Sequence, residues 1–375
     1  MLLPALLAAG AAVIGMGQMA AGTWLTRRFM AAPRLAPQAR PAVTLLKPLC
    51  GLEPGLEAAL ETAFTLAYPA CQLVFGVQDR ADPVIPLIER LRARHPERDV
   101  TLVIDETPHG ANRKVANLLN MLPAARHDVL VMSDADIFLP PDFLDHVVAA
   151  LETPGAGLAT TLYTGREAHH TPAGWAGAAQ LNYNFLPGVV LARALGRQDG
   201  LGATLALTRA MLAEIGGLQV VANNLADDQV LGRLVVAKGR KVVLAHTVPA
   251  TIVPEARLKP LFSHELRWAR TIRALVPGAY AASVLQMPLL WAALAVLLSG
   301  PAPWALVLFG LCLTARLATA DLIRQALALE TRTPWAVFLL REALSAAIYV
   351  ASFAGNHVAW RGHSLRADHG AVTLN

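Results

Sequence analysis

The segment Val129-Leu-Val-Met-Ser-Asp-Ala-Asp136 joins a short apolar run to two carboxylates that follow it directly. Short apolar runs rich in β-branched residues are typical of strands that are buried inside a sheet. Similar runs occur earlier in the chain, at residues 42–46, 71–77 and 100–104. We therefore expect residues 129–133 to form the fourth strand of a buried sheet, with both carboxylates at its end.

Helical patterns separate these predicted strands, at residues 56–66, 84–94 and 115–122. Asp82 and Pro83 precede the second pattern, and a carboxylate followed by proline favours the start of a helix. Strands that alternate with helices of this length imply βαβ units and a mainly parallel sheet. The sequence therefore predicts an α/β fold for the middle of the chain.

Parallel sheets bind their ligands at the carboxyl ends of their strands, and three of the predicted strands end in polar pairs: Gln78-Asp79, Asp105-Glu106 and Asp134-Ala135-Asp136. The third group offers two carboxylates as oxygen ligands for Mg²⁺ or Mn²⁺, which often lies between carboxylates and substrate phosphates. The alternative is a surface turn in which Asp bonds to the local backbone. The position after a buried strand favours the metal site.

Two sequence motifs of nucleotide-binding proteins are missing. No G-x-G-x-x-G follows the first predicted strand, and no G-x-x-x-x-G-K-[ST] occurs anywhere in the chain. Both observations argue against a dinucleotide-dependent oxidoreductase and a P-loop NTPase. The three cysteines lack metal-type spacing, so a zinc site is not expected.

A second acidic pair, Asp227-Asp228, opens the helical pattern at residues 229–238. One acid there would complement the helix dipole, whereas two like charges in one site raise the pKa of one member. Gly202 ends a Gly-Leu-Gly segment before the apolar run 203–207. It permits close approach of a ligand to the backbone, although a plain turn explains it equally well.

The segment His264-Glu-Leu-Arg-Trp-Ala-Arg270 belongs to a basic amphipathic helix that precedes an apolar run. Such a helix can lie on an anionic membrane surface, with Trp268 as its interfacial anchor. Alternatively, Arg267 binds a diphosphate and Trp268 lies beside an acceptor. Both interpretations can hold together. Nucleic-acid binding is not expected, because Lys and Arg do not cluster with stacking aromatic residues.

Charged residues are unevenly distributed along the chain. They make up 16% of it, against about 25% in a typical soluble protein, and residues 1–26 and 274–315 contain none. About 20 apolar residues are enough to cross a bilayer. Because Arg27 and Arg28 follow the first apolar run, the positive-inside rule places the middle of the chain in the cytoplasm. A signal peptide would need a basic start and a shorter apolar core.

Three apolar runs lie near the other end of the chain. Residues 284–298 and 304–320 flank Ser-Gly-Pro-Ala-Pro, which would break a single helix, so we expect a helical hairpin. Residues 335–354 contain Arg341 and Glu342, and charges at mid-bilayer are usually paired. This run can span the membrane, re-enter it or lie flat on it.

The expected organisation has five parts. They are a transmembrane anchor (1–26), a cytoplasmic α/β domain (27–256), an amphipathic interfacial helix (257–280), a membrane region of two or three helices (281–355) and a basic tail (356–375).

Five segments resemble the ceramide glucosyltransferase family, glycosyltransferase family 21, and they occur in the family's order. They are Val43–Gly51, Val77–Pro83, Asn112–Asn117, Ala226–Gln229 and His264-x-x-Arg267-Trp268. The segments 110–128, 185–187 and 191–196 most resemble the bacterial hopanoid-biosynthesis members, which glycosylate a polyhydroxylated triterpenoid lipid. Two departures stand out: His264 replaces the family's usual Gln or Arg, and both Asp residues of the Asp-x-Asp are present, whereas the animal enzymes keep only the first.

The resemblance implies a GT-A fold, a Rossmann-like domain, between N- and C-terminal transmembrane helices in a multi-pass protein of the bacterial inner membrane. It implies an inverting glycosyltransferase that moves glucose or N-acetylglucosamine from a UDP-sugar to a hydroxyl of a membrane lipid, a hopanoid polyol or, as the alternative, ceramide. A processive polysaccharide synthase would need a translocation channel, for which three or four membrane segments are too few, and a non-enzymatic membrane scaffold would not bind UDP.

The resemblance also assigns roles to individual residues. Asp228 is the catalytic base, and Asp134 and Asp136 hold the metal, Mg²⁺ or Mn²⁺, with the diphosphate. The remaining expected site residues bind the nucleotide sugar (Asp79, Lys114, Asn117, Asp134 and Arg267) or lie on the acceptor side (Trp268, Gly202, Asp227 and His264).

Overall fold

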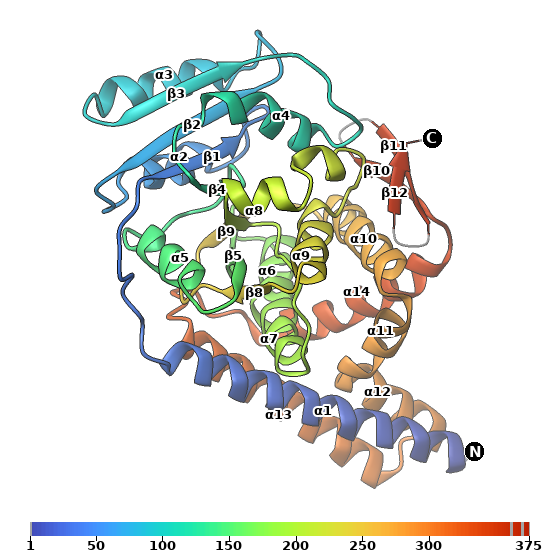
Figure 1. Ribbon diagram of the computed structural model, residues 1–375. Coiled ribbons are helices and arrows are strands. Elements are labelled where there is room, and N and C mark those ends of the chain that lie inside the picture. Colours follow the sequence, from blue (N-terminus) through green and yellow to red (C-terminus); the bar gives the residue numbers. More distant parts are fainter. Residues whose placement is uncertain (1, 361–362, 369–370, 375) are drawn as a thin grey trace.

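A seven-stranded mixed sheet forms the centre of the computed structural model, which describes residues 2–360, 363–368 and 371–374 (Figure 1). Its strand order is β3-β2-β1-β4-β7-β5-β8. The strands are β1 (Val43–Pro48), β2 (Cys71–Val77), β3 (Asp99–Ile104), β4 (Val129–Ser133), β5 (Ala156–Thr160), β7 (Thr204–Thr208) and β8 (Lys241–Leu244). The first four strands are parallel, and β7 pairs antiparallel with both β4 and β5. The predicted α/β fold is therefore confirmed.

Helices cover both faces of this sheet. One face packs against α2 (Leu56–Phe64), α3 (Ile85–Arg94) and α5 (Phe143–Leu151), and the other packs against α4 (Arg113–Met121), α8 (Arg209–Glu214) and α9 (Asp227–Ala237). Neighbouring residues of β1 show this directly, because Leu45 belongs to the first core and Leu46 to the second. Strands buried on both faces need continuous apolar sequences, which explains why β1, β2 and β4 were visible in the sequence; the edge strand β3 is only partly buried.

The turn before α3 differs from the prediction. The helix begins at Ile85, and the residue preceding it, Val84, makes no side-chain cap bond. The Asp82 carboxylate instead accepts hydrogen bonds from the backbone nitrogen atoms of Val84 and Gly51, each at 2.9 Å. Asp82 therefore links the loop after β1 to the loop after β2.

A smaller sheet and a long interrupted helix connect this domain to the apolar helices. The strands β6 (Thr164–Glu167) and β9 (Ala250–Val253) pair in parallel beside the main sheet. Next, α6 (Pro172–Gln180) runs through a π-helical turn at Leu181–Phe185 into α7 (Leu186–Ala194), which packs against α1 (Leu2–Ala31). The amphipathic α10 (Leu258–Leu275) follows β9.

Three helices of the described chain are long and apolar enough to cross a membrane: α1, α13 (Pro303–Ala326) and α14 (Trp335–Phe353). A fourth crossing would need Pro277–Gln286 and α12 (Pro288–Ser299), which are bent by 65° relative to each other, to act as one span. The hairpin expected from the runs 284–298 and 304–320 corresponds to α12 and α13, but its first arm begins only at Pro288, which lacks an N–H group and starts a new helix. The helices α1, α12 and α13 lie side by side (Figure 1).

Close packing of α1 depends on a glycine. A Cβ atom at Gly15 would lie 2.5 Å from the carbonyl oxygen of Leu285, so any larger residue would push α1 away from the bend before α12. At the other end of the chain, β10 (His357–Trp360), β11 (His363–Asp368) and β12 (Ala371–Leu374) form an antiparallel sheet beside α10 (Figure 1). The basic tail predicted from the sequence therefore contains strands.

Candidate active site

Three of the predicted motifs meet at the carboxyl edge of the central strands. Lys114, in the first turn of α4, places its Nζ atom 2.6 Å from Oδ1 of Asp134, which follows β4. The same ammonium donates a hydrogen bond to the carbonyl oxygen of Gly202 at 3.2 Å, just before β7. Since parallel strands end at one edge and an antiparallel neighbour begins there, sequence segments far apart in the chain are brought together.

The acidic pair at the start of α9 joins this group. Asp227 is buried and accepts a hydrogen bond from the side-chain amide nitrogen of Asn112 at 3.2 Å. The side-chain oxygen of Asn112 accepts a hydrogen bond from the backbone nitrogen of Val115 and so caps α4. A Cβ atom built on Gly202 would lie 3.2 Å from Oδ2 of Asp228, which places that carboxylate directly against the Gly202 backbone. Lys114, Asp134, Gly202 and the acidic pair therefore form one cluster, which we call the acid cluster.

The charges in the acid cluster shift the pKa values of its members. Burial and the Asp227 charge raise the pKa of Asp228 to about 7, against the opposing effect of Lys114. Burial also raises the pKa of Asp227. Burial alone would lower the pKa of Lys114, but the charges of Asp134, Asp227 and Asp228 outweigh it and raise this pKa. Lys114 therefore stays protonated, and Asp228 can accept a proton near neutral pH.

Asp136 lies at the edge of the acid cluster and is held by the small sheet. The Thr251 hydroxyl, on β9, donates a hydrogen bond to Oδ2 of Asp136. Burial and the neighbouring Asp134 charge raise the pKa of Asp136. A nearby cation would therefore stabilise the ionised form of this carboxylate.

The donor set fits a divalent ion that is shared with a substrate. The described residues contain no group of three or more His, Cys, Asp or Glu side chains placed to hold a metal by themselves. Asp134 and Asp136 supply two carboxylates, and Mg²⁺ and Mn²⁺ are commonly bound by one or two carboxylates together with phosphate oxygens. The four carboxyl groups of Asp134, Asp136, Asp227 and Asp228 outnumber the neighbouring ammonium groups of Lys114 and Lys47, which favours such an ion.

Lys47 supports the turn that carries Asp134 and was not identified from the sequence. Its side chain is buried, and Nζ donates to the carbonyl oxygen of Asp134 at 2.8 Å and is 3.4 Å from Oγ of Ser133. Burial lowers the pKa of Lys47 to about 8, although the charges of Asp136 and Asp134 oppose this effect. A lysine at the end of an apolar strand was the available signal, since an ammonium there needs several oxygen partners.

Tyr163 is a second residue that the sequence did not reveal. It follows β5, and its pKa is raised by burial and by the charges of Asp228, Asp134 and Asp136. Its ring lies 5.0 Å from that of Phe185, and both rings pack in a cluster that includes Trp268. Tyr163 therefore connects the acid cluster to α10.

The motif His264-x-x-Arg267-Trp268 on α10 forms a separate network of side-chain contacts. Nδ1 of His264 lies 2.6 Å from Oε1 of Glu255, and the His264 and Trp268 rings are 4.4 Å apart. Burial opposes ionisation of Glu255, but the hydrogen bond from His264 and the charges of His264 and Arg267 outweigh it and lower its pKa. His264 thus faces Glu255, and the negative charge of Glu255 offsets the positive charge of the motif at His264 and Arg267.

Two predicted nucleotide-binding residues occupy different positions. Asp79 is exposed after β2 and accepts a hydrogen bond from the backbone nitrogen of Ala81 at 2.8 Å. Asn117 is buried, and its amide donates to the carbonyl oxygen atoms of Gly76 at 2.8 Å and Leu49 at 3.3 Å. Asn117 therefore links the carboxyl ends of β1 and β2 through its hydrogen bonds to the backbone.

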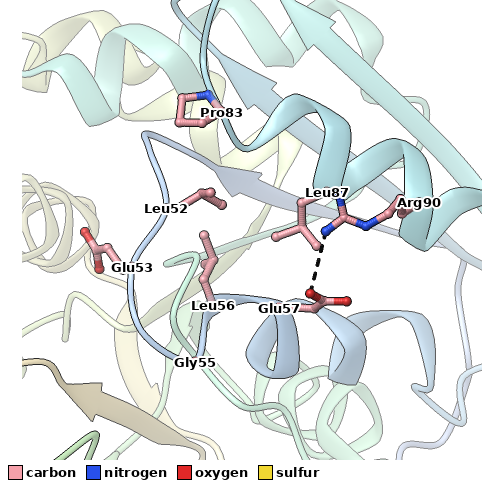
Figure 2. A pocket seen from close by; sticks show the side chains of 8 residues that line it. All are labelled: Leu52, Glu53, Gly55, Leu56, Glu57, Pro83, Leu87 and Arg90. Atoms are coloured by element: carbon pink, nitrogen blue, oxygen red, sulfur yellow. Dashed lines mark ion pairs between the residues drawn. The ribbon is translucent and has the colours of Figure 1, made fainter.

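A pocket outside the acid cluster lies between α2, α3 and the loop after β1 (Figure 2). Leu52, Leu56 and Leu87 give it apolar walls, and an ion pair between Glu57 and Arg90, at 3.7 Å, borders it. Glu53 points away from this ion pair (Figure 2). The predicted site residues are not part of its lining, so the acid cluster remains the candidate active site.

Comparisons with known proteins agree with this architecture. The sequence profile of Glycosyl transferase family 21 matches residues 7–373. Ceramide glucosyltransferase 1 of Caenorhabditis elegans is 24% identical over 251 residues, which cover 66% of this chain and 53% of the nematode protein. The ceramide glucosyltransferase of Candida albicans is 31% identical over 121 residues, or 29% of this chain and 22% of the yeast protein. The chain thus spans about half the length of the nematode relative and less of the yeast one.

The overall arrangement also matches a solved structure. A mannosyltransferase from Pyrobaculum calidifontis, determined in complex with GDP-mannose and Mn²⁺, superimposes with a TM-score of 0.54 at 20% identity. The match covers 94% of this chain and 99% of the mannosyltransferase, so the two proteins share the GT-A fold together with the flanking helices. The chain therefore belongs to glycosyl transferase family 21.

Proposed function

We propose that the protein is an inverting glycosyltransferase that moves glucose or N-acetylglucosamine from a UDP-sugar to a hydroxyl of a membrane lipid. The observation that carries this proposal is the acid cluster, in which a carboxyl of raised pKa, Asp228, lies beside the paired Lys114 and Asp134. A proton acceptor and a phosphate-binding charge set lie together at the edge of the sheet where ligands bind.

The donor would occupy the side of the cluster formed by Lys114, Asp134 and Asp136. Asp134 and Asp136 would hold Mg²⁺ or Mn²⁺, which neutralises charge on the departing diphosphate. Lys114 adds a permanent positive charge there, and Lys47 holds the backbone of the Asp134 turn in place. Asp79, at the end of β2, would contact the nucleoside, and Asn117 would shape that edge through its backbone bonds.

Asp228 would act as the base on the opposite side of the sugar. A lipid hydroxyl is a weak nucleophile, so inversion at the sugar carbon requires a carboxylate within hydrogen-bond reach of it. Asp134 and Asp136 would be occupied by the metal, and Asp227 is held by Asn112. Asp228 faces the Gly202 backbone, which has no side chain of its own to stand between the carboxylate and an acceptor.

The motif on α10 would close the site between donor and acceptor. Arg267 would stabilise the charge of the departing UDP, and Trp268, which packs against the same buried cluster as Tyr163, would line the path of the acceptor. His264 would act on Arg267 through Glu255 rather than bind phosphate itself.

The apolar helices favour a lipid acceptor taken from the bilayer. The segments of the hopanoid-biosynthesis type favour a hopanoid polyol, and the ceramide glucosyltransferase relatives support ceramide as the second candidate. The domain between α1 and α10 would face the cytoplasm of a bacterial inner membrane, because Arg27 and Arg28 follow α1. Reporter fusions at residue 150 test this orientation, and an exported reporter would contradict it.

The acceptor is tested by offering both lipids to the purified enzyme in detergent, with UDP-glucose or UDP-N-acetylglucosamine and Mn²⁺. Mass spectrometry then identifies the products. We expect hexosyl or N-acetylhexosaminyl hopanoid to form in preference to the ceramide product. Preferential glycosylation of ceramide would reverse the order of acceptors, and absence of both products together with absence of UDP binding would refute the proposed function.

A further inference from the structure

Two adjacent charged residues lie in the middle of the apolar helix α14. Arg341 and Glu342 are both buried, with 0% and 7% of their surfaces exposed. Charged side chains within an apolar helical bundle persist where they are paired and hydrogen-bonded. Their partners therefore indicate what these charges do.

Arg341 connects three helices through its guanidinium group. Nη1 donates to Oε1 of Glu265 on α10 at 2.8 Å and to the carbonyl oxygen of Ala176 on α6 at 3.3 Å. Nε donates to Oγ of Ser345, one turn further along α14, at 3.1 Å. The position and direction of the guanidinium are thus fixed from three sides.

Glu265 lies inside the active-site motif, between His264 and Arg267, but on another face of α10. Leu261, Glu265 and Ala269 are spaced by four residues and form the buried stripe of this helix. His264 and Trp268 form a second stripe, turned by about 100° from the first, since a helix has 3.6 residues per turn. The second stripe faces Glu255 and the cluster that contains Tyr163. A bond that holds Glu265 therefore sets the rotation of α10 about its own axis.

We propose that Glu265 and Arg341 are a positioning pair, through which the apolar helix α14 orients Arg267 and Trp268 for sugar transfer. The inference rests on the proposed function, because it assigns a role within that same site. It explains why an apolar helix keeps a buried arginine, since an apolar residue at either position would leave the rotation of α10 to weaker, non-directional contacts.

The chain offers a matched control in Glu342. Its Oε1 atom lies 3.8 Å from Nε of Arg316 on α13, and Arg316 also donates to the carbonyl oxygen of Tyr183 at 3.1 Å. This pair is buried among the same helices, and the bonds found within the described chain give it no link to α10. Glu342→Gln therefore breaks a buried ion pair without touching the motif helix.

The test compares Glu265→Gln with Glu342→Gln in the full-length protein in detergent. We expect Glu265→Gln to lower kcat by about 10- to 100-fold at a nearly constant KM for the UDP-sugar, because a misplacement of about 1 Å can cost about 10²-fold. Glu342→Gln removes a longer buried ion pair, so it should lose some thermal stability and keep the kcat of its folded fraction. Arg341→Lys, which retains the cation, should keep most of the turnover.

A second measurement does not depend on activity. Hydrogen exchange of residues 258–275 should accelerate in Glu265→Gln and stay at the wild-type rate in Glu342→Gln. Equal losses of kcat in the two variants, or unchanged exchange in α10, would show that the Glu265 pair contributes only bulk stability. If the wild type transfers no sugar, the proposed function fails, whereas the exchange result still decides whether the pair holds α10. If Glu265→Gln does not fold, exchange and turnover of Arg341→Lys and Arg341→Met provide the same comparison.

Discussion

Replacement of Gly202 by alanine should separate activity from stability at the proposed base. A Cβ atom at this position would lie 3.2 Å from Oδ2 of Asp228, and ordinary contact begins at 3.4 Å, so the carboxylate must move by a few tenths of an ångström. The described backbone gives Gly202 no positive φ, so alanine fits the chain there without strain. Gly→Ala stabilises a fold by about 0.4–1 kcal/mol where alanine adopts the native backbone without strain, and the displacement of Asp228 offsets part of this gain.

The catalytic effect should be much larger than the effect on stability. A displacement of about 1 Å can cost about 10²-fold in rate, so a few tenths of an ångström should lower kcat by about 3- to 10-fold. Steady-state kinetics with the UDP-sugar and the preferred lipid measure the effect, and the thermal midpoint of Gly202→Ala should equal or exceed that of the wild type. Gly188→Ala is the control, because a Cβ atom there meets nothing within 4 Å. A folded Gly202→Ala enzyme with unchanged kcat would refute the placement of Asp228 against the acceptor.

Three further predictions concern the donor side and pH. Asp136→Ala should fold but lose metal-dependent UDP-sugar binding and most turnover, since metal stabilisation is worth several kcal/mol; full activity with excess chelator would contradict this. Lys47→Met removes the bond to the Asp134 carbonyl, so it should raise the metal concentration needed for half-maximal activity, which a metal titration measures, and an unchanged titration would count against its role. Because the pKa of Asp228 is raised to about 7, its base form prevails only above that pH, so kcat/KM should rise with pH and level off above about 7; a profile that falls across this range would rule out a carboxylate base.

Four strands and the carboxylates at their ends could be predicted from the sequence for a physical reason. β1, β2 and β4 are buried on both faces by helices, which demands the continuous apolar runs that the sequence displays, and the edge strand β3 is apolar although it is only partly buried. Since their carboxyl ends share one edge, Asp134 and the residues that follow the other strands were found by inspecting where each run stops.

Other parts of the fold depend on long-range packing that leaves a weak local signal. The strand β5, Ala156–Thr160, contains alanine and glycine, so its sequence gives a weak strand signal, and it forms because it pairs with β7 and β8. Tyr163, which follows β5, was therefore missed. Lys47 was missed because its oxygen partners lie more than 80 residues away in the sequence. Arg341 and Glu342 left the course of α14 open, because their partners lie on α10, α6 and α13.

The identity of the base is the central claim, and Asp228→Asn tests it most directly. The variant keeps the size of the side chain and its place beside Gly202, but its amide cannot take a proton from the acceptor. We expect turnover of the lipid acceptor to fall by about 10²- to 10⁴-fold. The affinity for UDP-sugar and metal, measured by calorimetry, should stay within a few-fold, because the proposed donor contacts are with Lys114, Asp134 and Asp136. Normal turnover in Asp228→Asn, with the loss appearing instead in Asp227→Asn, would contradict the assignment and move the base to the other member of the pair.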